Sequence, residues 1–518
     1  STDKTLTLGA GSVTVISGGT WTRDGTLDID PDSKILYTTS DQTVLTNITH
    51  GNLEHDGGTL SLISNFIVAG TVTNTSGNFN ASVQNVTANG IVWNGGSVTT
   101  SQTWDIGTDG IDINGGTFVA TSGSFTVAGD WDMTGSGTFI PGSGTVIFDG
   151  TNPQSITSAS QTFYSVQISN TASSVSIADK FEMFSGGTLT IDENATFATA
   201  GNEFDDNGGT IVNNGTFEIN GDEHFSMENL SIPGNTRVVG SVFDITTLDS
   251  LVNVEFNPTG GVLTLGNDID YIFGNISVAE NTTFDMDVWD LELSNRKTVT
   301  NNGTWSAPSS GSKFTCLGNA TFLGENMNFS KFHAVSADAD TIIFKGANTY
   351  TISDSLTLGG IDGGELLITS DEIGSRATAF IDNTGDAQSV DYVKVYDVNG
   401  TEDHHISATN SWSLGGTTDY WDFPPTLYTF ETTGDWDTAS NWEQNVLPSA
   451  TDNIQVLSGA TLNLNGNRTI NDIYVEGIID IGADTLIVNG SIVVVDSISI
   501  GTGMLDANGV LDNNGSIS

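Results

Sequence analysis

The stretch from Gly115 to Gly150 decides the fold. It begins Gly-Gly-Thr-Phe-Val-Ala-Thr and continues Ser-Gly-Ser-Phe-Thr-Val-Ala, Gly-Asp-Trp-Asp-Met-Thr and Gly-Ser-Gly-Thr-Phe. In each piece, apolar and polar side chains alternate until Gly, Ser, Asp or Asn ends the run. Phe118 and Ala120, like Phe125 and Val127, are two positions apart and would point to one face of a β-strand. The stretch therefore predicts short strands joined by tight turns, and it has no helical period.

The Gly-Gly-Thr signature of this stretch returns at a regular interval along the chain. Taken as one or two coils each, the unbroken intervals give a period of roughly 19–22 residues, which is typical of solenoid repeats. The Leu-x-x-Leu-x-Leu frame of leucine-rich repeats is missing. The second glycine of the signature lies at Gly19, Gly58, Gly96, Gly116, Gly187 and Gly209, and Gly137 holds the same place in Gly-Ser-Gly-Thr.

These features predict an all-β, right-handed parallel β-helix (β-solenoid) with about 20–22 residues per coil. The chain has 518 residues, of which 61 are glycine. No stretch approaches the ~18 apolar residues of a membrane span. Residues 1–14 lack the basic start and the apolar core of a signal peptide. We therefore expect a mature chain, or a part cut from a longer one, that does not insert into a membrane.

The charge of the chain limits its partners. Thirteen basic and 63 acidic residues give a formal net charge of −50. Nucleic acid is excluded as a partner, because phosphate binding needs clustered Lys and Arg. An anionic membrane surface is disfavoured for the same reason. We expect the charge to be screened by salt or by cations outside the cell.

The single cysteine, Cys316, lies in the apolar sequence Phe-Thr-Cys-Leu-Gly. An internal disulfide is therefore impossible. Stacked coils do not need disulfides, so the low cysteine content does not indicate the cytosol. We predict that Cys316 is a small buried hydrophobic residue of one coil.

Residues 144–170 contain a longer motif. They read Gly-Thr-Val-Ile-Phe-Asp-Gly-Thr-Asn-Pro-Gln-Ser-Ile and later Phe-Tyr-Ser-Val-Gln-Ile-Ser-Asn. The motif resembles a recurring unit of repeat-rich secreted β-helix surface proteins of bacteria and archaea, which include autotransporter-like, adhesin-like and surface-layer-like proteins. The resemblance covers about a coil and a half. It implies an extracellular parallel β-helix and no catalytic residue.

An aromatic-rich region at 390–425, which ends in Pro424 and Pro425, divides the chain. We predict a long solenoid over residues 1–425, closed by this region, and a second, shorter solenoid over 426–518. The second segment begins with Gly434-Asp-Trp-Asp-Thr-Ala-Ser-Asn-Trp, followed by Pro448 and Asp452-Asn-Ile-Gln-Val. This spacing resembles the entry unit of β-helical segments in autotransporter-like surface proteins. By that resemblance, Trp436 and Trp442 would close the start of the second solenoid.

Aspartates at alternating positions are candidate calcium ligands, because Ca²⁺ prefers several hard oxygen ligands. Neither the EF-hand spacing nor the Gly-Gly-x-Gly-x-Asp repeat of calcium-binding β-rolls is present, so a solvated acidic face is the alternative. The histidine pairs at 50 and 55 and at 404 and 405 are expected in surface loops rather than in a zinc site. The calcium candidates are Asp28, Asp30, Asp32, Asp285 and Asp287.

Sequons of the Asn-x-Ser/Thr type are candidate glycosylation sites. No cofactor other than calcium is indicated. The Asn-Thr-Asp, Gly-His-Gly and Arg-Ile-Lys signatures of polygalacturonase-like enzymes are absent, as is an arginine placed beside an acidic cluster as in pectate lyases. We therefore expect no enzyme, with a polysaccharide lyase or hydrolase as the least favoured alternative. The sequons considered are at Asn47, Asn80, Asn85, Asn194, Asn281 and Asn319.

The expected function is structural. We predict an extracellular subunit of a self-assembling filament, sheath or surface layer, whose copies join through exposed strand edges or end coils. The alternative is an adhesin or stalk fragment of a giant surface protein that binds cell-surface glycans or other cells. Its mark would be exposed aromatic residues, with Trp289, Trp305 and Trp421 as candidates. The candidate assembly residues are Leu6, Leu8, Val13, Val15, Ile492, Val494, Ile498, Ile500 and Leu511.

Overall fold

The structure is a computed structural model of the chain. It is all-β, and no α-helix occurs among the residues that it describes. The described residues are 5–17, 26–38, 40–44, 48–82, 84–100, 103–120, 122–221, 230–243, 248–258, 261–266, 269–272, 274–306, 311–372, 378–414, 418–423 and 427–518.

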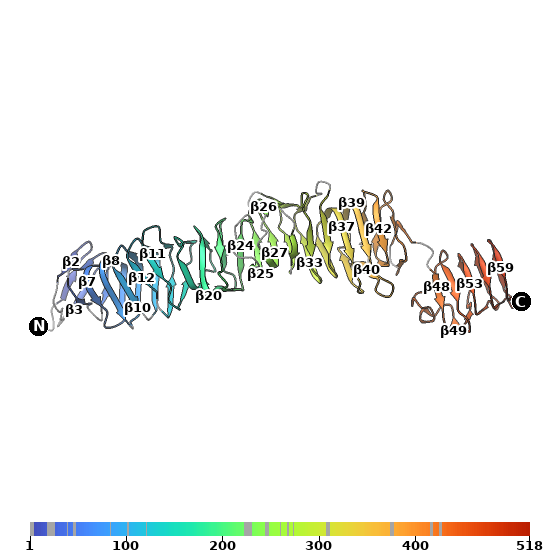
Figure 1. Cartoon of the computed structure of the whole chain (residues 1–518), viewed down its shortest axis with the longest axis horizontal. Helices are drawn as coiled ribbons and strands as arrows, with labels where there is room; N and C mark the ends of the chain where they lie inside the picture. The colour runs from blue at the N-terminus through green and yellow to red at the C-terminus, as the bar shows by residue number, and fades with distance from the viewer. Residues whose placement is uncertain are drawn as a thin grey trace. The chain divides into compact units, whose positions relative to one another are not determined.

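Stacked parallel strands form a β-solenoid of about 21 turns, which confirms the predicted fold class. Figure 1 shows the successive coils, with neighbouring strands side by side along the stack. Every pairing between named strands that the structure describes is parallel. Each coil therefore depends on its neighbours for hydrogen bonds and for burial of its apolar face.

Contacts within the chain divide it into two compact units, Ser1–Ser306 and Ala307–Ser518. In the first unit, strands β7 (Asn52–Ser61), β8 (Phe66–Ser82), β9 (Val86–Trp93), β11 (Trp104–Ile113) and β14 (Trp131–Asp132) stack in this order. Their inward side chains form one buried column, in register from strand to strand. The column is Leu53, Val72, Ile91, Ile111 and Trp131.

Successive members of this column follow one another at close to the predicted coil length. Other coils are longer. Trp131 pairs with Ile156 in β17 (Gln154–Thr157), which is a longer step along the chain. In the second unit, the step from Leu356 to its partner Gln388 is longer still. Turns and loops absorb the extra residues, because only the inward positions have to keep their register.

Aromatic rings fill the interior of the first unit. Trp104 stacks on Phe125 with ring centroids 5.8 Å apart and an interplanar angle of 12°. Phe163 and Phe181 stack at 5.1 Å and 15°. Each of these rings comes from a different coil and is fully buried. The coils are thus joined by ring contacts as well as by backbone hydrogen bonds.

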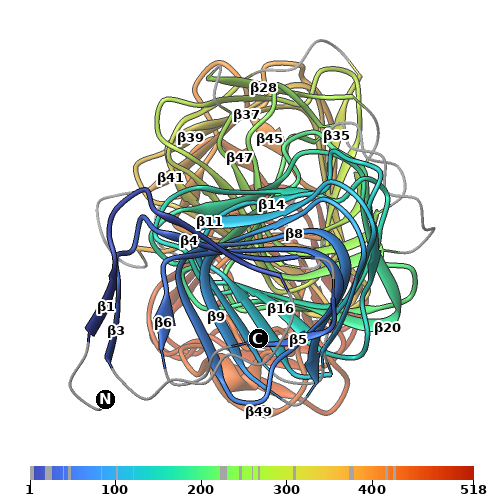
Figure 2. The ribbon, with the colours of Figure 1, turned by 90° about the vertical axis from the view of Figure 1, so that its left-hand side faces the viewer.

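The first described strands stand partly apart. Figure 2, in which the N-terminal coils face the viewer, shows β4 (Lys34–Thr38), β8, β9 and β11 around a common interior. Strands β1 (Thr5–Leu8) and β3 (Thr26–Ile29) lie to one side and form a sheet of two strands.

In the second unit, the strands from β48 (Leu427–Phe430) to β60 (Ser516–Ile517) form three sheets of their own. Their coils are regular, because Ile454, Ile473, Ile492 and Leu511 pair in succession at a constant step along the chain. The predicted boundary at residues 425 and 426, with Pro424 and Pro425, lies outside the described residues. The sheets over 427–517 are a separate stack in their hydrogen bonding.

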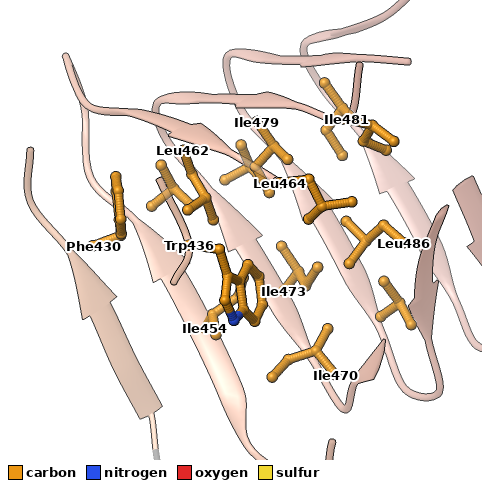
Figure 3. Close-up of a cluster of buried hydrophobic side chains, with 14 of the residues drawn as sticks. Phe430, Trp436, Ile454, Leu462, Leu464, Ile470, Ile473, Ile479, Ile481 and Leu486 are labelled. Carbon is orange, nitrogen blue, oxygen red and sulfur yellow. The ribbon is translucent and has the colours of Figure 1, made fainter. Parts of the chain in front are cut away.

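Trp436 and Trp442 belong to the core of this stack. Figure 3 shows Trp436 among apolar side chains from successive coils, including Ile454, Leu462 and Ile473. The indole N–H of Trp442 donates to the carbonyl of Trp436 at 3.0 Å, and the ring centroids are 5.1 Å apart. The two tryptophans thus pack against each other in the core of this stack.

Candidate functional site

Asparagine and aspartate side chains in the turns connect one coil to the next. The Oδ1 atom of Asn52 accepts the backbone N–H of Thr71 at 2.9 Å, and that of Asn453 accepts the N–H of Asp472 at 3.0 Å. The sequence separations are about one coil. These side chains replace a backbone partner at corners where the strands begin. The polar residues that make the turns also hold the stack together.

The motif at 144–170 serves one such corner. Gln154 is buried, and its Nε2 atom donates to the carbonyls of Val127 at 2.8 Å and Gly129 at 2.7 Å. Its Oε1 atom accepts the N–H of Gly150 at 2.9 Å and the Nδ2–H of Asn170 at 3.2 Å. The final Asn and the central Gln of the motif therefore belong to one buried hydrogen-bond network.

The aspartates proposed as calcium ligands take part in turns. Asp30 Oδ1 accepts the N–H of Asp32 at 2.9 Å, and Asp285 Oδ1 accepts the N–H of Asp287 at 3.0 Å. Asp28 is exposed on β3. Over the described ranges, no three His, Cys, Asp or Glu side chains lie together as a metal-holding group. Calcium binding stays a prediction.

The histidines divide into two kinds. His404 contacts Asp382 at 2.8 Å and His405 contacts Asp422 at 3.3 Å, both at the surface or half-buried. His50 and His55 are buried, so the prediction of surface loops is wrong for them. The ring of His55 lies 2.6 Å from Asn74 Oδ1 and 2.7 Å from the Gly57 carbonyl. His55 is therefore a buried, hydrogen-bonded residue of its coil.

The sequons lie in different environments. Asn85, Asn194 and Asn281 are exposed, whereas Asn80 and Asn319 are half-buried. Asn319 also bonds to the next coil, since its Oδ1 accepts the N–H of Thr341 in β38 (Thr341–Phe344) at 2.9 Å. Asn47 lies outside the described residues. Glycosylation of the exposed asparagines stays a prediction.

The candidate assembly residues are also divided by burial. Leu8 is buried in the core, Ile500 is partly buried, and Leu6 lies in β1. Ile492, Val494 and Ile498 are fully buried, because the coil of β58 (Met504–Ala507), β59 (Leu511–Asn513) and β60 covers them. Three side chains remain about half exposed or more: Val13, Val15 and Leu511.

The tryptophans proposed as an exposed glycan-binding patch do not form one. Trp305 is fully buried and Trp421 is 7% exposed, so the prediction is wrong for both, and Trp289 is half-buried. Cys316 is buried as predicted, and burial raises the pKa of its thiol. A high thiol pKa disfavours the reactive thiolate.

A polar groove of about 390 Å³ lies on the outer face of the first unit. Four neighbouring strands form it: β24 (Thr216–Ile219), β25 (Leu230–Val238), β27 (Leu248–Phe256) and β30 (Ile276–Val278). Its residues come from four successive coils. None was singled out in the sequence, because the polar residues of each coil look like ordinary outward positions of a single strand.

One row of the groove consists of amides. Asn253 Nδ2 donates to Asn235 Oδ1 at 3.1 Å. Asn253 Oδ1 accepts the N–H of Asn275 at 3.1 Å, and Asn275 Oδ1 accepts the N–H of Thr298 at 2.9 Å. The carbonyl oxygens of the amides are thus used between coils.

The second row is charged. Arg237 Nε donates to Glu255 Oε2 at 2.9 Å, and its terminal nitrogen lies 3.5 Å from Glu218 Oε2. The hydrogen bond with Glu255 is the main cause that raises the pKa of the Arg237 guanidinium above its usual value. Ser277 follows Glu255 in register on the next coil. The guanidinium therefore has a fixed position between two carboxylates.

Comparison with protein-family models, with curated proteins and with solved structures finds no match to this chain. In the part of the chain that the structure describes, no helix has the length and apolarity needed to cross a bilayer.

Proposed function

We propose that this chain is a non-enzymatic structural protein of the cell exterior, a subunit of a filament, sheath or surface layer. The observation that carries the proposal is the core of each unit, in which buried apolar side chains stack from coil to coil, with stacked aromatic rings in the first unit. In such a stack each coil is stabilised by contacts with its neighbours. The resemblance of residues 144–170 to secreted β-helix surface proteins supports the same function.

The acidic composition supports a location outside the cell. A net charge of −50 favours solubility and disfavours binding to anionic membranes. Self-association then has to occur at apolar positions that carry little charge. Val13, Val15 and Leu511 are the candidate assembly residues that remain exposed.

Electron microscopy and sedimentation velocity of the full chain test the proposal. We expect ordered fibres or sheets for the wild type, and dispersed particles for Val15→Lys and Leu511→Lys. Ile140→Lys is a matched control, because Ile140 in β15 (Thr138–Ile140) is similarly exposed but lies elsewhere on the chain. Dispersed wild-type particles at every protein concentration would contradict self-assembly. Equal loss of assembly in the control would show that Val15 and Leu511 are not specific assembly contacts.

A second candidate function, that of an adhesin or stalk that binds glycans, is favoured by the polar groove around Arg237. The groove offers amide, hydroxyl, carboxylate and guanidinium groups at the surface. These groups suit a hydroxyl-rich ligand. The two functions are compatible, because a surface scaffold can also hold a polysaccharide.

A further inference from the structure

We propose that the groove formed by β24, β25, β27 and β30 binds a neutral polysaccharide that lies across the strands, along successive coils. The groove volume of about 390 Å³ falls within the range of small-molecule sites. Hydrogen-bonding side chains recur on each coil, about 4.8 Å apart along the stack. This repeat is comparable to the length of one sugar unit in an extended chain.

The groove offers donors and acceptors side by side. The amide row is Asn235, Asn253 and Asn275, and Thr216 precedes Asn235 in register. The Oδ1 atoms of the three amides accept hydrogen bonds from neighbouring coils. The amide Nδ2–H groups of Asn235 and Asn275 are then the natural donors to a ligand. In the charged row, the carboxylates of Glu218 and Glu255 are acceptors. A sugar hydroxyl, which both donates and accepts, matches this arrangement.

The charges favour a neutral ligand. Arg237 compensates part of the negative charge of Glu218 and Glu255, so the charged row is close to neutral but still slightly acidic. The rest of the chain is strongly acidic. An anionic polysaccharide such as a polyuronate would therefore be repelled. A neutral chain avoids this cost.

The groove is prearranged for binding. Arg237 is held by two carboxylates, and the Asn side chains are held by bonds between coils, so few rotamers are lost when a ligand binds. Among the described residues that line the groove, none is aromatic. Without ring stacking, we expect weak binding, with a Kd on the order of 0.1–1 mM for an oligosaccharide.

Titration calorimetry of the full chain with neutral β-linked hexasaccharides of glucose, mannose and N-acetylglucosamine tests the proposal. A hexauronate of similar length serves as the anionic probe. We expect binding of at least one neutral probe and none of the hexauronate. Failure of every neutral probe to bind, a preference for the hexauronate, or cleavage of a bound oligosaccharide would overturn the proposal.

Two variants locate the site. Arg237→Met removes the guanidinium, whose N–H groups that are not bonded to Glu218 or Glu255 are further donors in the groove. The change should weaken binding about tenfold, which corresponds to one lost charged hydrogen bond. Ser277→Leu fills the groove without touching the ion pairs and should abolish binding. A normal circular dichroism spectrum of Ser277→Leu would show that the variant is folded. This variant then tests the site even if Arg237→Met misfolds.

Lys180→Met is the matched control. Lys180 also lies among carboxylates on the outer surface, 2.9 Å from Glu203 and 3.8 Å from both Glu182 and Asp205. It lies outside the groove lining. We expect unchanged affinity in this variant. Equal weakening by Lys180→Met, or unchanged affinity in both groove variants, would overturn the assignment of the groove.

Discussion

The corners at Gly150 and Gly346 have the same sequence frame but different buried polar groups. In each corner an inward Phe is followed by Gly two positions later and by a buried polar side chain four positions after that. The polar residue is Gln154 in the first corner and Tyr350 in the second. The comparison shows that different residue types can make the hydrogen bonds of this corner.

The same neighbours are bonded in the two corners. Gln154 Nε2 donates to the carbonyl of Val127, which pairs with Phe148 from the adjacent coil. The Tyr350 hydroxyl donates to the carbonyl of Phe322 at 3.3 Å, and Phe322 pairs with Phe344 in the same way.

The two corners differ in how the turn amides are bonded. Gln154 also accepts the glycine N–H itself, whereas the Tyr350 hydroxyl accepts the N–H of Lys345 at 3.0 Å. The N–H of Gly346 is accepted by Asp371 at 2.7 Å. In the first corner one amide side chain makes these hydrogen bonds. In the second corner the equivalent bonds are divided between a phenol and a carboxylate.

The largest effect is expected for Gln154→Leu. The variant leaves the Gly129 carbonyl and the Gly150 N–H without their partner, whereas the Val127 carbonyl keeps the N–H of Asp149 at 3.1 Å. We expect a loss of about 3 kcal/mol in unfolding free energy. Urea unfolding measures the loss, and hydrogen exchange at the Gly150 amide locates it. Gln167→Leu is the control, because Gln167 is only half-buried and bonds the half-buried Asp192. An effect of Gln154→Leu no larger than that of the control would mean that the corner does not need the network.

A smaller effect is expected at high pH in the second corner. Burial is the main cause that raises the pKa of Tyr350 to about 12. The unfolded chain loses its phenol proton near pH 10, whereas the folded chain keeps it, so stability is complete below about pH 10 and falls as the pH approaches 12. The two-unit shift corresponds to about 2–3 kcal/mol.

Tyr350→Phe separates this titration from other alkaline effects. At neutral pH the variant should lose about 1 kcal/mol, the net value of its hydrogen bonds. Between about pH 10 and 12 it should lose less stability than the wild type, because its ring cannot ionise. Parallel pH curves for the two proteins would show that Tyr350 does not titrate with unfolding. The Gln154 corner has no phenol and should show no corresponding change in hydrogen exchange.

The smallest effect is expected for Asp371→Ala. The change removes the acceptor of the Gly346 N–H and the ion pair with Lys345, whose Nζ lies 3.6 Å away. We expect a loss of about 1 kcal/mol or less, since this site is partly exposed. Asp371→Asn should retain most of the stability, because its amide oxygen can still accept the N–H. Equal losses in Ala and Asn variants would assign the effect to charge instead.

The sequence predicted the solenoid because strand alternation and a glycine period are properties of single coils. It could not predict the longer steps, such as the one from Leu356 to Gln388, because loops carry no periodic signal. The sequence also led to the hypotheses that Asp30 binds calcium and that Asn319 is glycosylated. In the structure both side chains accept hydrogen bonds from backbone amides. Local spacing does not distinguish a metal ligand from a turn acceptor.

The groove was missed because its parts are a full coil apart in the chain. A repeated triplet could have indicated it: Thr216-Phe-Glu, Asn235-Thr-Arg, Asn253-Val-Glu and Asn275-Ile-Ser each place two polar residues around an inward one. Each triplet begins about one coil after the previous one. Only the stacked register turns these separate pairs into two adjacent rows.

The constant step between inward residues from Ile454 to Leu511 has an evolutionary consequence. Duplication or deletion of one such unit would leave every remaining inward side chain facing an equivalent neighbour. Each event would change the stack by one strand spacing of about 4.8 Å. The length of this segment can therefore change by whole coils. In-frame recombination between the repeats would produce such a change and would keep the packing of the core.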